Sequence, residues 1–257
     1  MIGIVAEIAG LRVALGIVSA PCVLIAAGGG AVVARERAAS PASQSPTGSR
    51  LDHPSAAMPW QAHEGATRMV EPRPLFIPVI LGTVRQGRRS APVARLMVSE
   101  LSRRPGIETD LIDVARLPLR VDDAGEATKD PTFAAQMNRA DALVVVSPEY
   151  NHGYSGLLKH VLDSCLREYI HKAVGVVGVS AGPFGGARGI QDLLPVLREL
   201  GLVTIFWDVH FATVQNVFDE SGVLREPAYL PRIDKFLKEL VWMARTLRHG
   251  REHIVLE

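Results

Sequence analysis

The sequence has few cysteines, few aromatic residues and almost no net charge, and each shortage excludes a class of protein. Its 257 residues include only 2 cysteines, Cys22 and Cys165, which lie far apart and make neither a disulfide framework nor a metal-binding cluster. The formal net charge of +1 gives no strong field for attracting nucleic acid or an anionic membrane. Aromatic residues make up 5%, while Ala, Val, Leu and Gly are plentiful, which favours α/β packing over a β-sandwich. We therefore expect a cytoplasmic protein that binds neither metal nor nucleic acid.

The first 73 residues differ in composition from the rest, and we expect residues 1–73 to form a non-globular extension. Residues 13–33 carry no charge and make a stretch long enough to cross a bilayer. Pro21 and the run Gly28–Gly30 weaken this stretch as a helix. Residues 38–75 are rich in Ala, Ser, Pro and Gly with little periodicity, which indicates a linker.

Two interpretations of this extension stay open. In the first, residues 13–33 are a membrane anchor that tethers the following domain, and any membrane contact of the protein depends on it. In the second, the extension is a dispensable leader and the natural start lies near Met58 or Met69. Met69 lies just ahead of the first convincing strand, which favours the second interpretation.

From residue 74 to about residue 250, strand-like apolar runs alternate with amphipathic helices, which predicts one α/β domain. Strands are expected at 75–81, 107–113, 142–146, 173–179 and 202–207, with an extension or added strand in 208–217. Helices are expected from Ser90 to Leu101 and over 133–139, 156–166, 190–200 and 232–247. Such alternation predicts a doubly wound, five-stranded parallel sheet with right-handed crossovers. The first strand is strongly apolar and the second is more polar, which suits the flavodoxin-like order 2-1-3-4-5 with the second strand at an edge.

The loop Gly82–Ser90, GTVRQGRRS, joins the first strand to its helix and has the make-up of an anion site. Ser90 is a suitable N-cap, and the backbone N–H groups and dipole of a helix N-terminus favour negative charge. Thr83 can donate a hydroxyl hydrogen bond, while Arg85 and Arg88 carry guanidinium groups that match phosphate oxygens. The alternative is a solvated basic loop of no special function.

The stretch Ser147–Asp163, SPEYNHGYSGLLKHVLD, follows the third strand. It places Pro, Glu, Tyr, Asn, His and two Gly in a short turn at the end of a buried strand. An open α/β sheet binds its ligand beyond the carboxyl ends of its strands, so this turn is a candidate site. The helix that follows has one apolar face, made by Leu157, Leu158, Val161, Leu162 and Cys165.

A second glycine-rich turn, SAGPFGGARG at Ser180–Gly189, follows the fourth strand. Its glycines 182, 185 and 186 allow backbone to approach a flat ligand closely, with N–H groups free to donate. A plain strand-to-helix connection is the alternative, although this loop has more glycine than a tight turn needs.

In the expected strand order, the loops after strands one, three and four meet at the switch point of the sheet. The first of them, Gly82–Ser90, has neither the GxGxxG pattern of a dinucleotide site nor the GxxxxGK[ST] pattern of a Walker loop. Only the first loop offers donors for a phosphate. A planar ligand with one phosphate, such as FMN, therefore fits the three loops better than an NAD dinucleotide.

Together the three loops resemble the NADPH-dependent FMN reductase family, which includes quinone, azo and chromate reductases, over residues 76 to about 210. Position by position, the resemblance implies a phosphate loop with Thr83, Arg85, Arg88 and Ser90, a loop bordering the isoalloxazine with Pro148, Glu149, Tyr150 and Asn151, and a loop flanking the ring with Ser180, Gly182, Gly185 and Gly186. The chain departs from the family at His160, where Asn is frequent, and the N-terminal extension has no counterpart.

The resemblance implies a hydride transfer from NADPH or NADH to FMN, and then electron transfer to a quinone-like or other small acceptor. Because the flavin carries that chemistry, no catalytic side chain is expected, and Glu149 is not expected to be a general base. Tyr150 and His152 are candidates for shaping the open face of the flavin. Members of the family are usually homodimers with the flavin near the interface. We therefore expect this chain to form a homodimer or a homotetramer, with the helix from Gly156 as a candidate contact.

The alternative function is that of a non-enzymatic, flavodoxin-like electron carrier or redox sensor. Such a protein would bind FMN but would not react directly with NAD(P)H. Flavodoxins are typically acidic, and the net charge of +1 counts against this alternative.

Overall fold

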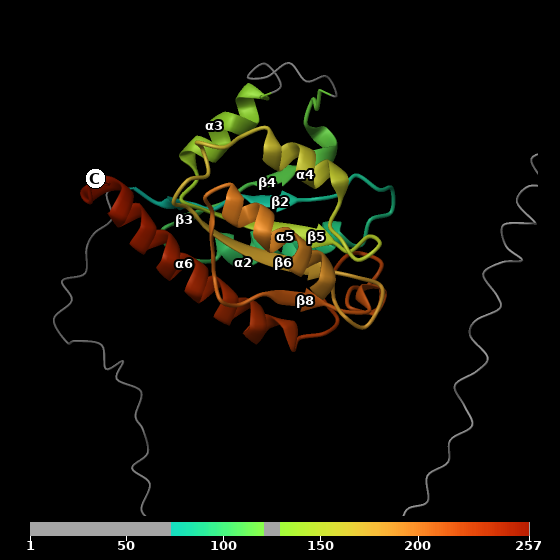
Figure 1. The fold of residues 1–257 in the computed structure, drawn as a ribbon. Helices are drawn as coiled ribbons and strands as arrows, with labels where there is room; N and C mark the ends of the chain where they lie inside the picture. Colours follow the sequence, from blue (N-terminus) through green and yellow to red (C-terminus); the bar gives the residue numbers. More distant parts are fainter. Residues whose placement is uncertain (1–72, 121–128, 257) are drawn as a thin grey trace, which may run out of the picture. The chain divides into compact units, whose positions relative to one another are not determined.

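A parallel sheet runs through the computed structural model, which describes residues 73–120 and 129–256 (Figure 1). The expected extension, including its apolar stretch 13–33, lies outside the described residues apart from Arg73. In the two described ranges, no helix has the length and apolar character needed to cross a membrane.

The order of the strands confirms the order expected from the sequence. The strands are β1 (Leu75–Phe76), β2 (Val79–Leu81), β3 (Ile107–Glu108), β4 (Leu111–Asp113), β5 (Ala142–Pro148), β6 (Ala173–Val179), β7 (Val203–Thr204) and β8 (Val209–Phe211). They pair in parallel in the order β4-β2-β5-β6-β7, with β8 also on β6 and β1 on β3. The first expected strand thus lies between the second and the third, and the second forms an edge.

Three of the expected strands are interrupted, and the second of them, over 107–113, is divided into β3 and β4 at Thr109 and Asp110. The first is divided into β1 and β2 at Pro78, which has no N–H to donate to a neighbouring strand. The fifth was expected as a continuous strand over 202–207, which is wrong: only β7 and β8 pair with β6, and Phe206 and Trp207 between them are exposed. Of the extension or added strand expected over 208–217, only Val209–Phe211 forms a strand, β8.

The helices are α2 (Ser90–Ser102), α3 (Pro131–Arg139), α4 (Gly156–Asp163), α5 (Ala187–Glu199) and α6 (Tyr229–His253), with 3₁₀ turns at Val114–Arg116 and Val214–Asn216. Helix α4 ends before the expected Leu166, because the N–H and the hydroxyl of Ser164 both bond the carbonyl of Val161 and tighten the last turn. Gly201, with φ +76°, ends α5 as expected.

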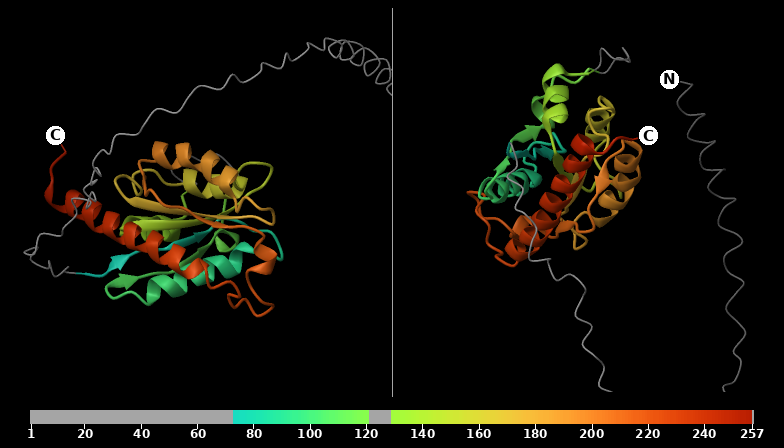
Figure 2. Two further views of the ribbon diagram at one scale, coloured as in Figure 1. Left: turned by 90° about the horizontal axis from the view of Figure 1, so that it is seen from below. Right: turned by 90° about the vertical axis from the view of Figure 1, so that its left-hand side faces the viewer.

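Side chains alternate between the two faces of the sheet and meet a different set of helices on each. Leu75, Ile77 and Val79 join a core with α2 and α6, whereas Phe76 and Ile80 join a core with α3, α4 and α5. Figure 2 shows these helices as layers on opposite sides of the strands. The domain is therefore the doubly wound α/β fold that the alternating pattern predicted.

Helix α6 lies close against the sheet at one glycine. A Cβ on Gly175 of β6 would come within 2.3 Å of Cζ of Phe236, which is fully buried. The missing side chain leaves room for the aromatic ring directly on the strand.

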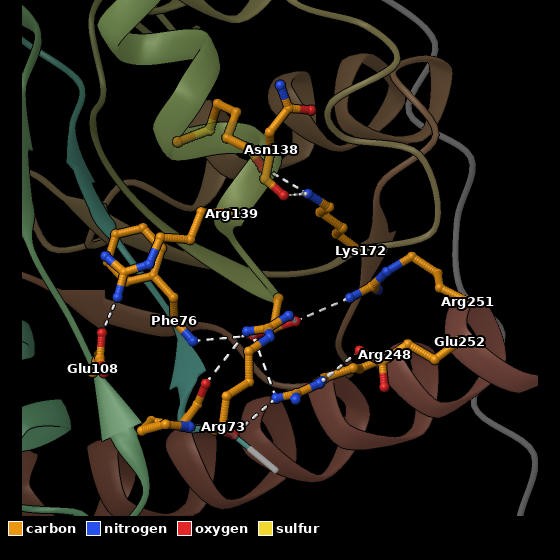
Figure 3. Close-up of polar contacts among 12 residues, drawn as sticks. Arg73, Phe76, Glu108, Asn138, Arg139, Lys172, Arg248, Arg251 and Glu252 are labelled. Atoms are coloured by element: carbon orange, nitrogen blue, oxygen red, sulfur yellow. Dashed lines mark hydrogen bonds and ion pairs between the residues drawn. The ribbon is translucent and has the colours of Figure 1, made fainter. Parts of the chain in front are cut away.

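Beyond the amino ends of the strands, three arginines surround one buried carboxylate (Figure 3). Asp141, just before β5, accepts hydrogen bonds from Arg73 at 2.7 and 3.0 Å, from Arg251 at 3.2 Å and from the N–H of Phe76 at 3.1 Å. Arg248 pairs with it at 3.8 Å. Arg248 and Arg251 lie in the last turns of α6. Their contacts with Asp141 stabilise the part of the helix that continues beyond residue 247, where the sequence predicted its end.

Lys172, just before β6, lies next to the arginine cluster and is almost fully buried. Its ammonium group donates to the carbonyls of Met137 and Asn138 at 2.6 and 2.9 Å, in the last turn of α3 (Figure 3). Burial, followed by the nearby charge of Arg251, lowers the pKa of Lys172 to about 8.

Candidate functional site

Three polar loops gather at the carboxyl ends of β2, β5 and β6, opposite the arginine cluster (Figure 1). They are the first loop, Gly82–Arg89, the second loop, Glu149–Ser155, and the third loop, Ser180–Gly186. The first and second are joined by a hydrogen bond between Thr83 and Tyr150. The second and third are joined because Glu149 pairs with Arg188, directly beyond the third loop. The structure thus brings together the loops that the strand order predicted to meet.

The first loop contains two arginines with different surroundings. The guanidinium of Arg88 is bonded to the carbonyl of Thr83 and to the carboxylate of Asp113, at the end of β4. Arg88 therefore fixes the shape of the loop. Arg85 is exposed to solvent, and its guanidinium remains within reach of a ligand.

Helix α2, which follows the first loop, begins at Ser90 and has features of an anion site. The sequence suggested Ser90 as the N-cap, but Arg89 holds that position and makes no side-chain hydrogen bond to the helix. Ser90 is only 3% exposed, and its hydroxyl has no hydrogen-bond partner among the described residues. An uncapped helix N-terminus with a buried, unpaired hydroxyl suits a phosphate, which would accept hydrogen bonds from both.

The second loop contains a tight turn that the sequence did not indicate. Tyr150 and Gly153 exchange backbone hydrogen bonds of 2.8 and 3.0 Å across Asn151 and His152. These two residues have φ values of +52° and +71°, so the turn is of type I′. His152 is exposed and occupies a position that glycine usually takes, at a cost in backbone strain.

The side chain of Tyr150 turns toward the first loop. Its hydroxyl lies 2.8 Å from Oγ1 of Thr83, and the guanidinium carbon of Arg85 lies 4.4 Å from the centre of its ring. Thr83 is 1% exposed, so this contact is made to a buried hydroxyl. Two residues expected in the phosphate loop are thus in direct contact with one expected beside the flavin ring.

Glu149 is held by the start of α5. Its carboxylate accepts from the backbone N–H of Arg188 at 3.2 Å and from the guanidinium at 3.4 Å. The same guanidinium lies 4.5 Å from the ring centre of Phe184, which is 57% exposed. Arg188 was absent from the residues expected from the sequence, although its position at a helix N-terminus after two glycines was a usable signal.

The glycines of the third loop have different roles. A Cβ on Gly186 would lie 2.6 Å from the nitrogen of Val179, and one on Gly185 would lie 2.7 Å from Cβ of His210. Both have positive φ and allow the loop to pack against β6 and β8. A Cβ on Gly182 would meet nothing within 4 Å, so only this glycine faces open space.

The segment after β8, which was expected to be part of an extension or added strand but forms a turn and a 3₁₀ helix, supports the third loop. Thr213 and Val214 donate backbone hydrogen bonds of 3.0 and 3.1 Å to the carbonyls of Gly182 and Ser180. The hydroxyl of Ser180 donates to the same Gly182 carbonyl at 3.0 Å.

Pro148, at the end of β5, is buried and lies close to α5: its carbonyl oxygen would be 3.3 Å from a Cβ on Gly189.

The described residues offer little other chemistry. They contain no group of three metal-ligating side chains. Cys165 is buried, as its apolar position predicted, and burial, with a smaller effect of Glu168, raises the pKa of its thiol to about 11. The site formed by the three loops therefore suits the binding of a phosphorylated planar group, and FMN is such a group.

Known proteins give an independent indication of the same ligand. The model of the family described as NADPH-dependent FMN reductase matches residues 76–214. An NAD(P)H-dependent FMN reductase of Pseudomonas aeruginosa is 31% identical over 159 residues, which are 56% of this chain and 82% of that protein. A quinone reductase of Pseudomonas putida is 33% identical over 173 residues, 62% of this chain and 91% of that protein.

A solved structure agrees on the fold. The NAD(P)H:(acceptor) oxidoreductase FerB of Paracoccus denitrificans superposes with a TM-score of 0.57 at 20% identity, over 67% of this chain and 98% of that one. Taken with the match over more than half of the chain, the three loops and the strand order lead to one conclusion: this chain belongs to the NADPH-dependent FMN reductase family.

Proposed function

We propose that the three loops hold FMN and that the protein passes electrons from NAD(P)H through FMN to quinone-like acceptors. Family membership makes the chain an FMN-dependent NAD(P)H oxidoreductase. The proposal adds the residues that hold the flavin and the class of acceptor. The observation that carries it is the buried hydroxyl of Ser90, unpaired within the described residues, at the uncapped start of α2 and close in sequence to the exposed Arg85.

The phosphate of FMN would be held by Ser90, by Arg85 and by the first N–H groups of α2. Hydrogen bonds to a charged phosphate are stronger than those between neutral groups, and the dipole of a helix N-terminus adds to them. Arg88 would act indirectly, because Asp113 and the carbonyl of Thr83 already occupy its guanidinium.

The ring system would lie between the second and third loops. Backbone groups of Pro148, Glu149, Tyr150 and Asn151 would border one edge, and Ser180 and Gly182 would flank the ring, with Gly185 and Gly186 shaping the loop. When bound, the flavin supplies the electron-transfer chemistry. The chain's own residues would bind and orient it, and the exposed His152 would help to shape the open face where NAD(P)H and the acceptor enter in turn.

The acceptor class rests on relatives, one of which is the quinone reductase of Pseudomonas putida. A homodimer in the cytoplasm completes the proposal. The exposed Leu157 on α4 and Leu166 just after it offer apolar surface for a subunit contact.

Flavin uptake followed by turnover tests this function. The purified protein should bind FMN at micromolar concentration, turn yellow and then oxidise NADPH or NADH in the presence of a quinone. Each nicotinamide is assayed with and without FMN and with and without the quinone. Failure to bind FMN at micromolar concentration would contradict the proposal.

A further inference from the structure

Tyr150 belongs to the second loop, but its side chain contacts two residues of the first loop. We propose that Tyr150 is the positioning residue for Arg85: its hydroxyl is anchored on buried Thr83, and its ring supports the guanidinium that binds the flavin phosphate. This inference rests on the proposed function, because it takes the phosphate of FMN as the ligand of Arg85.

Thr83 is a rigid anchor for the tyrosine. It is 1% exposed, its carbonyl accepts from Arg88, and its hydroxyl oxygen accepts from the N–H of Arg85 at 3.4 Å. A hydroxyl has two acceptor positions and one proton, so the same oxygen can also bond the hydroxyl of Tyr150 at 2.8 Å. Because both the carbonyl and the hydroxyl of Thr83 are held by hydrogen bonds, the hydroxyl offers a fixed partner that orients the ring of Tyr150.

The ring of Tyr150 supports Arg85 through a cation–π contact. The guanidinium carbon lies 4.4 Å from the ring centre, well within the range of that attraction. An exposed arginine otherwise samples many rotamers, and immobilising it on binding lowers affinity. An arginine already resting on a fixed ring loses less freedom when a phosphate arrives, so Tyr150 should strengthen phosphate binding without touching the phosphate.

The turn in the second loop keeps the tyrosine in place. Tyr150 is the first residue of the type I′ turn and is bonded to Gly153 on both backbone groups. The loop expected to border the flavin ring therefore orients the arginine expected to bind its phosphate. The two ends of the cofactor site are coupled through one side chain.

Flavin affinities of paired variants test this inference. Tyr150→Phe and Thr83→Val each remove one hydroxyl and preserve the shape of the side chain. Each should raise the dissociation constant of FMN about 3- to 10-fold, the effect of one hydrogen bond, and leave that of riboflavin unchanged. The double variant should bind FMN no more weakly than Thr83→Val alone, because Thr83→Val already removes the bond that Tyr150→Phe removes. Tyr150→Leu, which removes the ring itself, should weaken FMN further.

The decisive comparison uses an Arg85→Ala background, in which Tyr150→Phe should have no further effect on FMN. Arg103→Ala, at the far end of α2, controls for the loss of one positive charge. Equal losses for FMN and riboflavin, or a full effect of Tyr150→Phe without Arg85, would overturn the inference while the proposed function stands. A wild-type protein that binds neither flavin would overturn both.

Discussion

The carboxylate of Glu149 accepts two hydrogen bonds from one residue, Arg188, through its backbone N–H at 3.2 Å and its guanidinium at 3.4 Å. This pairing joins the second loop to the first turn of α5. A carboxylate engaged in this way orients two loops and is poorly placed to move protons in the reaction. Its role can be separated from general base catalysis by substitution.

Replacement of Glu149 by Gln should change the maximal rate of NADPH oxidation less than about 10-fold, because the flavin carries the chemistry. The FMN dissociation constant should rise, since Gln weakens the contact with Arg188. Loss of a true general base costs about 100-fold or more, and a loss of that size would contradict this account. Glu220→Gln, at an exposed carboxylate, is the matched control.

Replacement of Arg85 by Ala should weaken FMN about 10- to 100-fold, the range for a hydrogen bond to a charged group. Riboflavin lacks the phosphate, so its affinity should hardly change. Fluorescence titration of both flavins measures the difference, with Arg103→Ala as the charge control. Equal weakening of the two flavins would remove Arg85 from the phosphate site.

Replacement of Gly175 by Ala should destabilise the domain by about 1–3 kcal/mol, because the new methyl group would lie 2.3 Å from Phe236 before any adjustment. Gly250→Ala is the matched control: it lies in α6, where a Cβ meets nothing within 4 Å. That change should be neutral or stabilising by up to about 1 kcal/mol. Urea unfolding of both variants tests the packing, and similar stabilities would show that α6 does not rest on β6 as described.

Lys172 should make stability depend on alkaline pH. Its pKa is about 8 in the folded protein, below the ordinary value of 10.5. Between these two pH values, Lys172 is protonated in the unfolded chain but not in the folded protein, so the free energy of unfolding rises with pH. Below about pH 8, Lys172 is protonated in both states and does not make stability depend on pH. From pH 7 to 10, the free energy of unfolding of the wild type should therefore rise by on the order of 2 kcal/mol relative to that of Lys172→Met.

Urea unfolding of the two proteins at several pH values measures this gain. Lys238→Met removes an exposed ammonium group and serves as the control. The difference in free energy of unfolding between the wild type and this variant should change much less between pH 7 and 10. A constant difference between wild type and Lys172→Met across this range would show that Lys172 keeps an ordinary pKa.

The sequence predicted the strand order and the three loops because both depend on local patterns. Runs such as Ala142–Val146 and Ala173–Val179 are apolar and β-branched, and each is followed at once by a polar, glycine-containing turn. Those signals determine where strands end, and the parallel order then determines which loops meet.

Contacts between residues far apart in the chain left no such signal. The sequence placed Arg88 in the phosphate loop but gave no sign of its pairing with Asp113, 25 residues away. The type I′ turn at Asn151 and His152 was missed because a histidine occupies a position that usually requires glycine. The extent of α6 depends on Asp141, 110 residues before Arg251.

The most direct test of the central claim is anaerobic stopped-flow reduction of the FMN-loaded protein by NADPH and by NADH. The account predicts that at least one nicotinamide bleaches the bound flavin in a single rapid phase, at a rate no slower than steady-state turnover with a quinone. Bound FMN that stays oxidised with both nicotinamides would contradict it, and would indicate an electron carrier or redox sensor in place of a reductase.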